Sequence, residues 1–259
     1  MFDAITLAYV VLGAASGFLS GLIGGGAGIL IVPVLSLFGQ NAIAGPASAV
    51  AVAMCSVTAA LQIRRRFVGV DAIAPRPGLI LCGSAFLTAH LGVGMNQFAP
   101  IFAIPLTLAL FVFLSLDLTA RVHHGLVGRT VIGDRSPNDF FGRYVLFGSA
   151  TAIFGGIVGS GGGLLLFPLL HAYCGMTTRE AVYSCLLMML GSSLSSVSTQ
   201  IYLGTPDYTV ALPLGIGAIL GGYFGVLAIE MVSEDAIRTI ARAMLLELGL
   251  FLLIASFLL

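Results

Sequence analysis

Two glycine-rich stretches carry the residue types best suited to bind an anion in this chain. The first reads Gly21-Leu-Ile-Gly-Gly-Gly-Ala-Gly-Ile-Leu-Ile-Val-Pro33, and the second reads Gly156-Ile-Val-Gly-Ser-Gly-Gly-Gly-Leu-Leu-Leu-Phe-Pro168. A helix that begins after a glycine turn presents unpaired backbone N–H groups and the positive end of its dipole, equivalent to about half a charge. Two such ends would hold a small oxyanion without a buried arginine, so the predicted chemistry is anion binding by backbone amides.

The two stretches belong to an internal repeat. Six glycines and prolines of the first stretch and its surroundings recur at an offset of 135: Gly13, Gly21, Gly24, Gly26, Gly28 and Pro33 match Gly148, Gly156, Gly159, Gly161, Gly163 and Pro168. Looser matches follow at an offset of 136, where Asp71 and Pro77 meet Asp207 and Pro213. We therefore expect two homologous transmembrane halves, residues 1–118 and 144–259, joined by a polar cytoplasmic linker, residues 119–143.

Composition places the chain in a lipid bilayer. Of its 259 residues, 58% are hydrophobic and 8% are charged, against about 45–50% and about 25% in soluble domains. Long apolar runs with short polar breaks are typical of membrane-spanning helices of about 20 residues. The sequence thus predicts an all-α polytopic membrane protein, with no nucleic-acid partner.

Two of the eight apolar blocks are too long for one helix. The blocks are residues 5–38, 46–63, 77–95, 99–118, 144–174, 180–203, 208–230 and 236–258. As continuous helices, the first and fifth would measure about 50 and about 46 Å, against a hydrocarbon core of about 30 Å. Clustered glycines are costly inside a helix, so we expect each block to break there, with Pro33 and Pro168 near the first turn of a second half-helix. Irregular backbone in a membrane must be satisfied by protein or a water-filled cavity, which marks the breaks as functional candidates.

Two membrane topologies fit these blocks, and the 11 basic residues, all arginine, distinguish them. If all eight blocks cross, Arg179, Arg238 and Arg242 fall on the side opposite the other arginines. If the first and fifth blocks are re-entrant hairpins, every arginine lies on one side. The positive-inside rule favours this second topology, with extracytoplasmic termini and halves related by inversion. A first block that crosses once and then bends is the alternative.

Close helix packing is the other explanation of the glycines. Small residues four positions apart let helix backbones approach, which we expect of Gly13, Gly17 and Gly21 and of Gly217, Gly221 and Gly225. For the two breaks we favour an anion site. Its predicted residues are Gly24, Gly25, Gly26 and Gly28 in the first half, and Gly159, Ser160, Gly161, Gly162 and Gly163 in the second.

Polar side chains in the neighbouring blocks are candidates for completing the site. Hydroxyl and amide groups that could hydrogen-bond an oxyanion are Ser48, Ser56 and Gln62 in the first half, and Ser192, Ser193 and Gln200 in the second. The alternative for each is a bond between helices, worth about 0.6 kcal/mol on average in membranes. His90 and Glu247, which we place near midplane depth, are candidates for proton coupling, with a satisfied hydrogen bond inside the bundle as the alternative.

No metal site or cofactor is predicted. The four cysteines lie in apolar segments without a CxxC pair, and His123-His124 has no acidic or cysteine partner at ligand spacing. An intramembrane serine hydrolase that uses Ser160 is the alternative function. Such a site uses glycine where Val158 stands, and the first half has Gly25 in place of the serine. A backbone anion site, by contrast, works in both halves.

The duplicated motifs GLIGGGAGILIVP and GIVGSGGGLLLFP, in two halves with a polar central loop, resemble the sulfite exporter TauE/SafE family of membrane permeases. The resemblance covers essentially the whole chain. It implies a multi-pass protein of the inner membrane that exports a small sulfur-containing anion: sulfite, thiosulfate or an organosulfonate such as sulfoacetate. It also implies that the glycine motifs line the substrate path, in keeping with alternating access between two halves. A homo-oligomer is compatible with this assignment.

Overall fold

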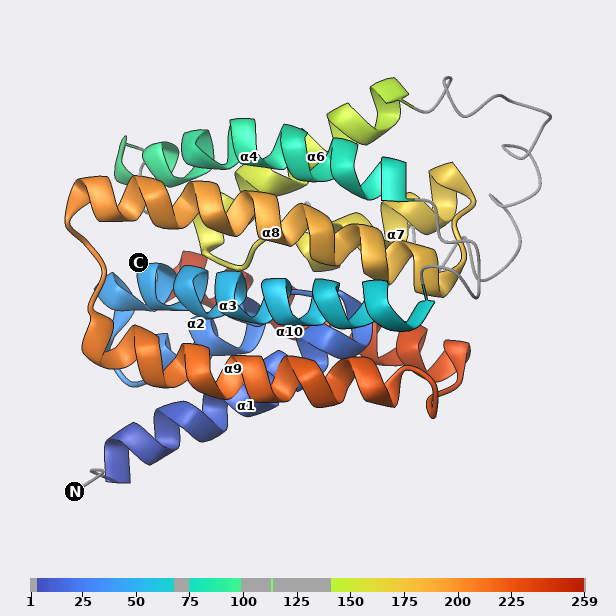
Figure 1. Cartoon of the computed structure of the whole chain (residues 1–259). Coiled ribbons are helices and arrows are strands. Elements are labelled where there is room, and N and C mark those ends of the chain that lie inside the picture. The colour runs from blue at the N-terminus through green and yellow to red at the C-terminus, as the bar shows by residue number, and fades with distance from the viewer. Residues whose placement is uncertain (1–3, 68–74, 99–112, 114–140, 259) are drawn as a thin grey trace.

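The computed structural model of the chain describes residues 4–67, 75–98, 113 and 141–258, and all regular elements in these ranges are α-helices (Figure 1). The helices are α1 (Ala4–Ile23), α2 (Gly28–Leu37), α3 (Asn41–Phe67), α4 (Pro75–Phe98), α6 (Phe141–Val158), α7 (Gly163–Cys174), α8 (Thr178–Leu203), α9 (Tyr208–Ala228) and α10 (Glu234–Leu258). The predicted all-α class is confirmed.

Six of these helices are long and apolar enough to cross a membrane, namely α1, α3, α4, α6, α8 and α9. The short apolar helices α2 and α7 lie between them in sequence. The predicted block at residues 99–118 and most of the predicted linker fall outside the described residues. Helix α6 begins at Phe141, three residues before the predicted apolar block 144–174, and the division into two halves and a linker stays a prediction.

Glycines allow α1 and α9 to pack backbone against backbone. A Cβ atom added at Gly217, Gly221 or Gly225 of α9 would collide with a carbonyl oxygen of α1, at Val10, Ala14 or Phe18 respectively. Added at Gly17 of α1, it would collide with the carbonyl oxygen of Ala218. The interpretation of these two ladders as packing surfaces is therefore confirmed.

Helices α4 and α6 pack in the same manner as α9 and α1. Gly225 of α9 lies against Phe18, and Gly92 of α4 lies against Ile153 of α6. Phe18 and Ile153 are 135 residues apart, whereas Gly92 and Gly225 are 133 apart. The match of Pro77 with Pro213 at an offset of 136 therefore does not pair spatially equivalent residues. The offset of 136 differs by three residues, almost one helical turn, from the offset of 133 that these contacts give for α4 and α9.

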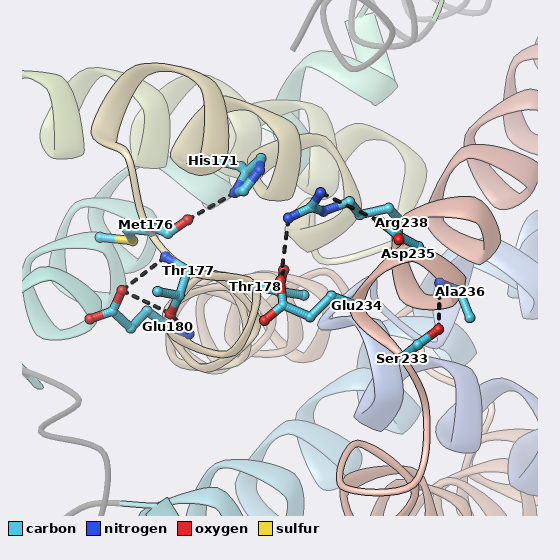
Figure 2. Close-up of polar contacts among 10 residues, drawn as sticks. All are labelled: His171, Met176, Thr177, Thr178, Glu180, Ser233, Glu234, Asp235, Ala236 and Arg238. Atoms are coloured by element: carbon cyan, nitrogen blue, oxygen red, sulfur yellow. Dashed lines mark hydrogen bonds and ion pairs between the residues drawn. The ribbon is translucent and has the colours of Figure 1, made fainter. Parts of the chain in front are cut away.

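The described arginines lie at one end of the bundle. The C-terminal end of α3 and the N-terminal ends of α4, α6, α8 and α10 are on the right in Figure 1, whereas both chain termini are on the left. Figure 2 shows the polar contacts at this end. Thr178 Oγ1 of α8 donates to Glu234 Oε2 of α10 (2.9 Å), which joins the two helices. Arg238, also in α10, donates to the same carboxylate (3.3 Å). A capping box of Thr177 and Glu180 starts α8 at this end. This distribution is the one that the hairpin topology predicts.

Cysteine labelling tests the topology. In a thiol-free background, Gly175→Cys and Ser233→Cys should both react with an impermeant reagent from the cytoplasmic side, because both positions lie at the arginine-rich end. Tyr202→Cys, at the C-terminal end of α8, should react from the opposite side; Tyr202 is 90% exposed. Labelling of positions 175 and 233 from opposite faces would contradict the hairpin topology.

Glycine-to-alanine variants test the backbone packing of α1 on α9. Gly221→Ala should lower the melting temperature of detergent-purified protein, because its Cβ collides with Ala14 and overpacking costs about 1–3 kcal/mol. Gly83→Ala is the matched control, since that exposed helical glycine has no atom within 4 Å of its Cβ position. There alanine should be neutral or stabilising. Equal melting temperatures in the two variants would argue against close packing.

Candidate functional site

The two glycine segments separate consecutive helices. Residues 24–27 lie between α1 and α2, and residues 159–162 lie between α6 and α7. Gly24 and Gly26 have φ values of 65° and 84°, and their counterparts Gly159 and Gly161 have values of 78° and 79°. Side chains rarely adopt this left-handed region, so glycine is required at equivalent positions of both segments.

The segments contact each other backbone to backbone. A Cβ atom added at Gly28 would lie 2.5 Å from the carbonyl oxygen of Gly159, and one added at Gly163 would collide with the carbonyl oxygen of Gly24. These two contacts are equivalent under the offset of 135. Gly26 lies in the same way against the carbonyl oxygen of Ser160. Every residue of both segments is buried, so the crossing point lies inside the bundle.

The N-terminal ends of α2 and α7 flank this crossing. The residues that precede the two helices, Ala27 and Gly162, provide no side-chain cap for their first amides. Neither first turn contains an acidic residue. Both ends therefore present partial positive charge with no carboxylate to neutralise it.

The prolines of the motif lie deeper than predicted. Pro33 and Pro168 are each the sixth residue of their helix rather than part of the first turn. The helices begin at Gly28 and Gly163, the last glycine of each sequence motif. At the sixth position a proline has no N–H for the carbonyl four residues earlier. That carbonyl belongs to Ile29 in α2 and to Leu164 in α7.

Two serine hydroxyls satisfy carbonyl groups of the second segment. Ser192 Oγ of α8 donates to the carbonyl oxygen of Gly161 (2.8 Å), and Ser48 Oγ of α3 donates to that of Gly159 (2.7 Å). Both serines were among the hydroxyls predicted to complete the site, but as donors to an anion rather than to carbonyl groups of the segment.

The other predicted polar residues do not bond the segments. Ser56 and Ser193 donate to carbonyls of their own helices, at Ala53 and Leu190. Gln62 is half-buried. Gln200 is buried, and its Oε1 has no hydrogen-bond partner among the described residues.

The remaining glycines of the prediction are packing contacts. A Cβ atom at Gly25 would approach Ile23 and Leu164, one at Gly161 would lie 2.9 Å from Val52 Cγ1, and one at Gly162 would collide with the carbonyl oxygen of Thr151. Steric collision at these positions means that a larger residue would disturb the packing as well as any bound anion.

The titratable candidates lie elsewhere. His90 in α4 and Glu247 in α10 are exposed, in contrast to the buried glycine segments. Within the described ranges, no group of three or more histidine, cysteine or acidic residues could hold a metal ion. Ser160 is buried, and no histidine or carboxylate of the described residues hydrogen-bonds it. The serine hydrolase alternative is therefore unsupported.

Removing the Ser192 hydroxyl tests the role of this bond. Ser192→Ala leaves the buried carbonyl of Gly161 without its donor, so the free energy of unfolding should fall by about 1–3 kcal/mol, the cost of an unsatisfied buried group. Ser193→Ala is the matched control, because its hydroxyl bonds a carbonyl of its own helix. Thermal unfolding in detergent measures both. Equal stability of the two variants would show that the Gly161 carbonyl does not need this donor.

Comparison with known proteins places this arrangement in a family. The family model described as Sulfite exporter TauE/SafE matches residues 9–252. This span includes both glycine segments, helices α2, α6 and α7, and α1 from Tyr9 onward. No curated protein and no solved structure matches the chain. Because the match covers nearly its full length, this chain belongs to the sulfite exporter TauE/SafE family of membrane transporters.

Proposed function

We propose that the protein exports a small sulfur-containing anion, such as sulfite, thiosulfate or an organosulfonate like sulfoacetate, across the inner membrane. Family membership supports anion export in general. The observation that supports this particular site is that α2 and α7 both begin inside the bundle without a side-chain cap, and that the first residue of each, Gly28 or Gly163, contacts the glycine segment of the other half. A sulfite or sulfonate group has three oxygens that could accept hydrogen bonds from backbone amides of both ends.

Backbone amides suit this task better than an arginine would. Each helix end supplies about half a positive charge without the cost of burying a full charge in the membrane. In the structure the segments touch directly, as at Gly26 and Ser160. An anion therefore requires the two segments to part, and a site that forms and closes in this way fits a transport cycle.

Inverted halves and alternating access are part of the proposal. Figure 1 supports inversion, because α1 begins at the end of the bundle that contains both termini, whereas α6 begins at the opposite end. The reciprocal contacts of Gly28 with Gly159 and of Gly163 with Gly24 also support a two-fold relation between the halves. Rocking of such halves about a central site exposes it to each side in turn.

The arginine-rich end supports export as the direction. Exposed Arg64 and Arg65 of α3 and Arg76 of α4 lie at this end. Positive potential raises the local concentration of anions and their association rate. Cytoplasmic substrate would therefore be drawn to the end from which export begins. Proton coupling through His90 or Glu247 stays a prediction.

A charge placed at Ala27 tests the anion site. Ala27→Asp puts a carboxylate before the first amides of α2, where it should compete with the substrate, so efflux of radiolabelled sulfite from proteoliposomes should fall by about tenfold or more, a loss of about 1.4 kcal/mol. Ala27→Asn is the control, since it has nearly the same size without the charge. Both proteins should elute as single species in size-exclusion chromatography. Equal efflux from the two variants would remove α2 from the site.

A further inference from the structure

Met189 of α8 contacts glycines of both segments. Its side chain is fully buried. Its sulfur occupies the place of a Cβ atom at Gly163, its Cγ lies 3.4 Å from the Cβ position of Gly161, and its Cε lies 3.8 Å from that of Gly26. One side chain from a neighbouring helix thus fills the space where the two segments cross.

The backbone of Met189 is held close to the second segment. Ser192 Oγ approaches both the carbonyl oxygen of Gly161 (2.8 Å) and that of Met189 (3.2 Å). This hydroxyl joins α8 to the segment one turn after the methionine. Any adjustment at the crossing is therefore easiest for the Met189 side chain, which has three rotatable bonds and a flexible thioether.

The equivalent residue of the first half is stiffer. Gly24 lies against Val182 and Cys185 of α8, and Gly159 lies against Gly45 and Ser48 of α3. Both relations give an offset of 137 between α3 and α8, which pairs Met189 with Val52. Val52 Cγ1 lies 2.9 Å from the Cβ position of Gly161, so both residues border the crossing. A β-branched valine has few side-chain rotamers, so only the methionine side of the crossing can adapt.

We propose that Met189 sets the size of the anion that the protein accepts. This inference rests on the proposed function. The side chain fills the crossing in the observed conformation and withdraws by rotation when the segments part around a sulfite or sulfonate group. Because its backbone is held by Ser192, the methionine can free only limited space. Small anions such as sulfite should therefore be preferred over sulfonates with a longer carbon chain.

Transport by proteoliposomes tests this size limit. Efflux of sulfite, methanesulfonate, sulfoacetate and 1-propanesulfonate is measured for the native protein, Met189→Ala and Met188→Ala. Met189→Ala should raise the rate of propanesulfonate relative to sulfite by about tenfold or more, since one methylene group in an apolar pocket gives discrimination of about 10–200-fold. Met188 is equally buried in the same helix but is not among the atoms nearest to the segment glycines, so Met188→Ala should leave this ratio within about twofold of the native one.

Two further variants separate specificity from stability. Met189→Leu keeps most of the volume, so it should retain the native size preference. Met189→Val, which introduces the residue type of the equivalent position, is a milder truncation and should widen the range in the same direction if Met189→Ala does not assemble. A uniform loss for all four anions, or the same change of ratio in Met188→Ala, would overturn the role of Met189. A native protein that moves none of the anions would instead refute the proposed function.

Discussion

The contact between the two glycine segments is the constraint on which the rest of the structure depends. A membrane offers no water to irregular backbone, so two non-helical segments at its interior must find their partners within the protein. Here they approach so closely that Gly28 meets Gly159 and Gly163 meets Gly24. Only glycine permits both this proximity and the left-handed backbone at Gly24 and Gly26.

The surrounding helices serve this contact in two ways. Pairs such as α1 with α9 and α4 with α6 approach through glycines, so the helices that precede the two segments are closely packed. Helices α3 and α8 supply the hydroxyls of Ser48 and Ser192, which pair with carbonyls that the second segment leaves open. The carbonyl groups are thus satisfied by side chains, whereas the first amides of α2 and α7 have no side-chain cap. In the proposed anion site, backbone amides of these first turns are the donors.

The two halves share a frame but differ in detail. Equivalent contacts recur at offsets of 135, 137 and 133 along the successive helices. Helix α7 is two residues longer than α2, and the connection from α3 to α4 is longer than that from α8 to α9. Yet Ser160 stands where the first half has Gly25, and Met189 where it has Val52. Among the described residues, side-chain hydroxyls donate to carbonyls of the second segment only. Equivalent helix contacts with different side chains at the crossing are compatible with the proposed transport cycle, in which the two halves would contact the substrate differently.

The sequence alone determined the all-α membrane class, the position of both non-helical segments and the family, because hydropathy, composition and glycine clustering act locally. Helix breaks were predicted at residues 24–28 and 159–163, and the structure has buried non-helical residues at 24–27 and 159–162; a role in anion binding stays a prediction. Tertiary structure decided which polar residues reach them. Ser192 does, whereas its neighbour Ser193 bonds its own helix, and His90 and Glu247 are exposed. A helix turns by about 100° per residue, so these roles depend on how each helix is rotated in the bundle. That rotation is fixed by packing between residues more than a hundred positions apart, such as Ser48 and Gly159, which no local pattern encodes.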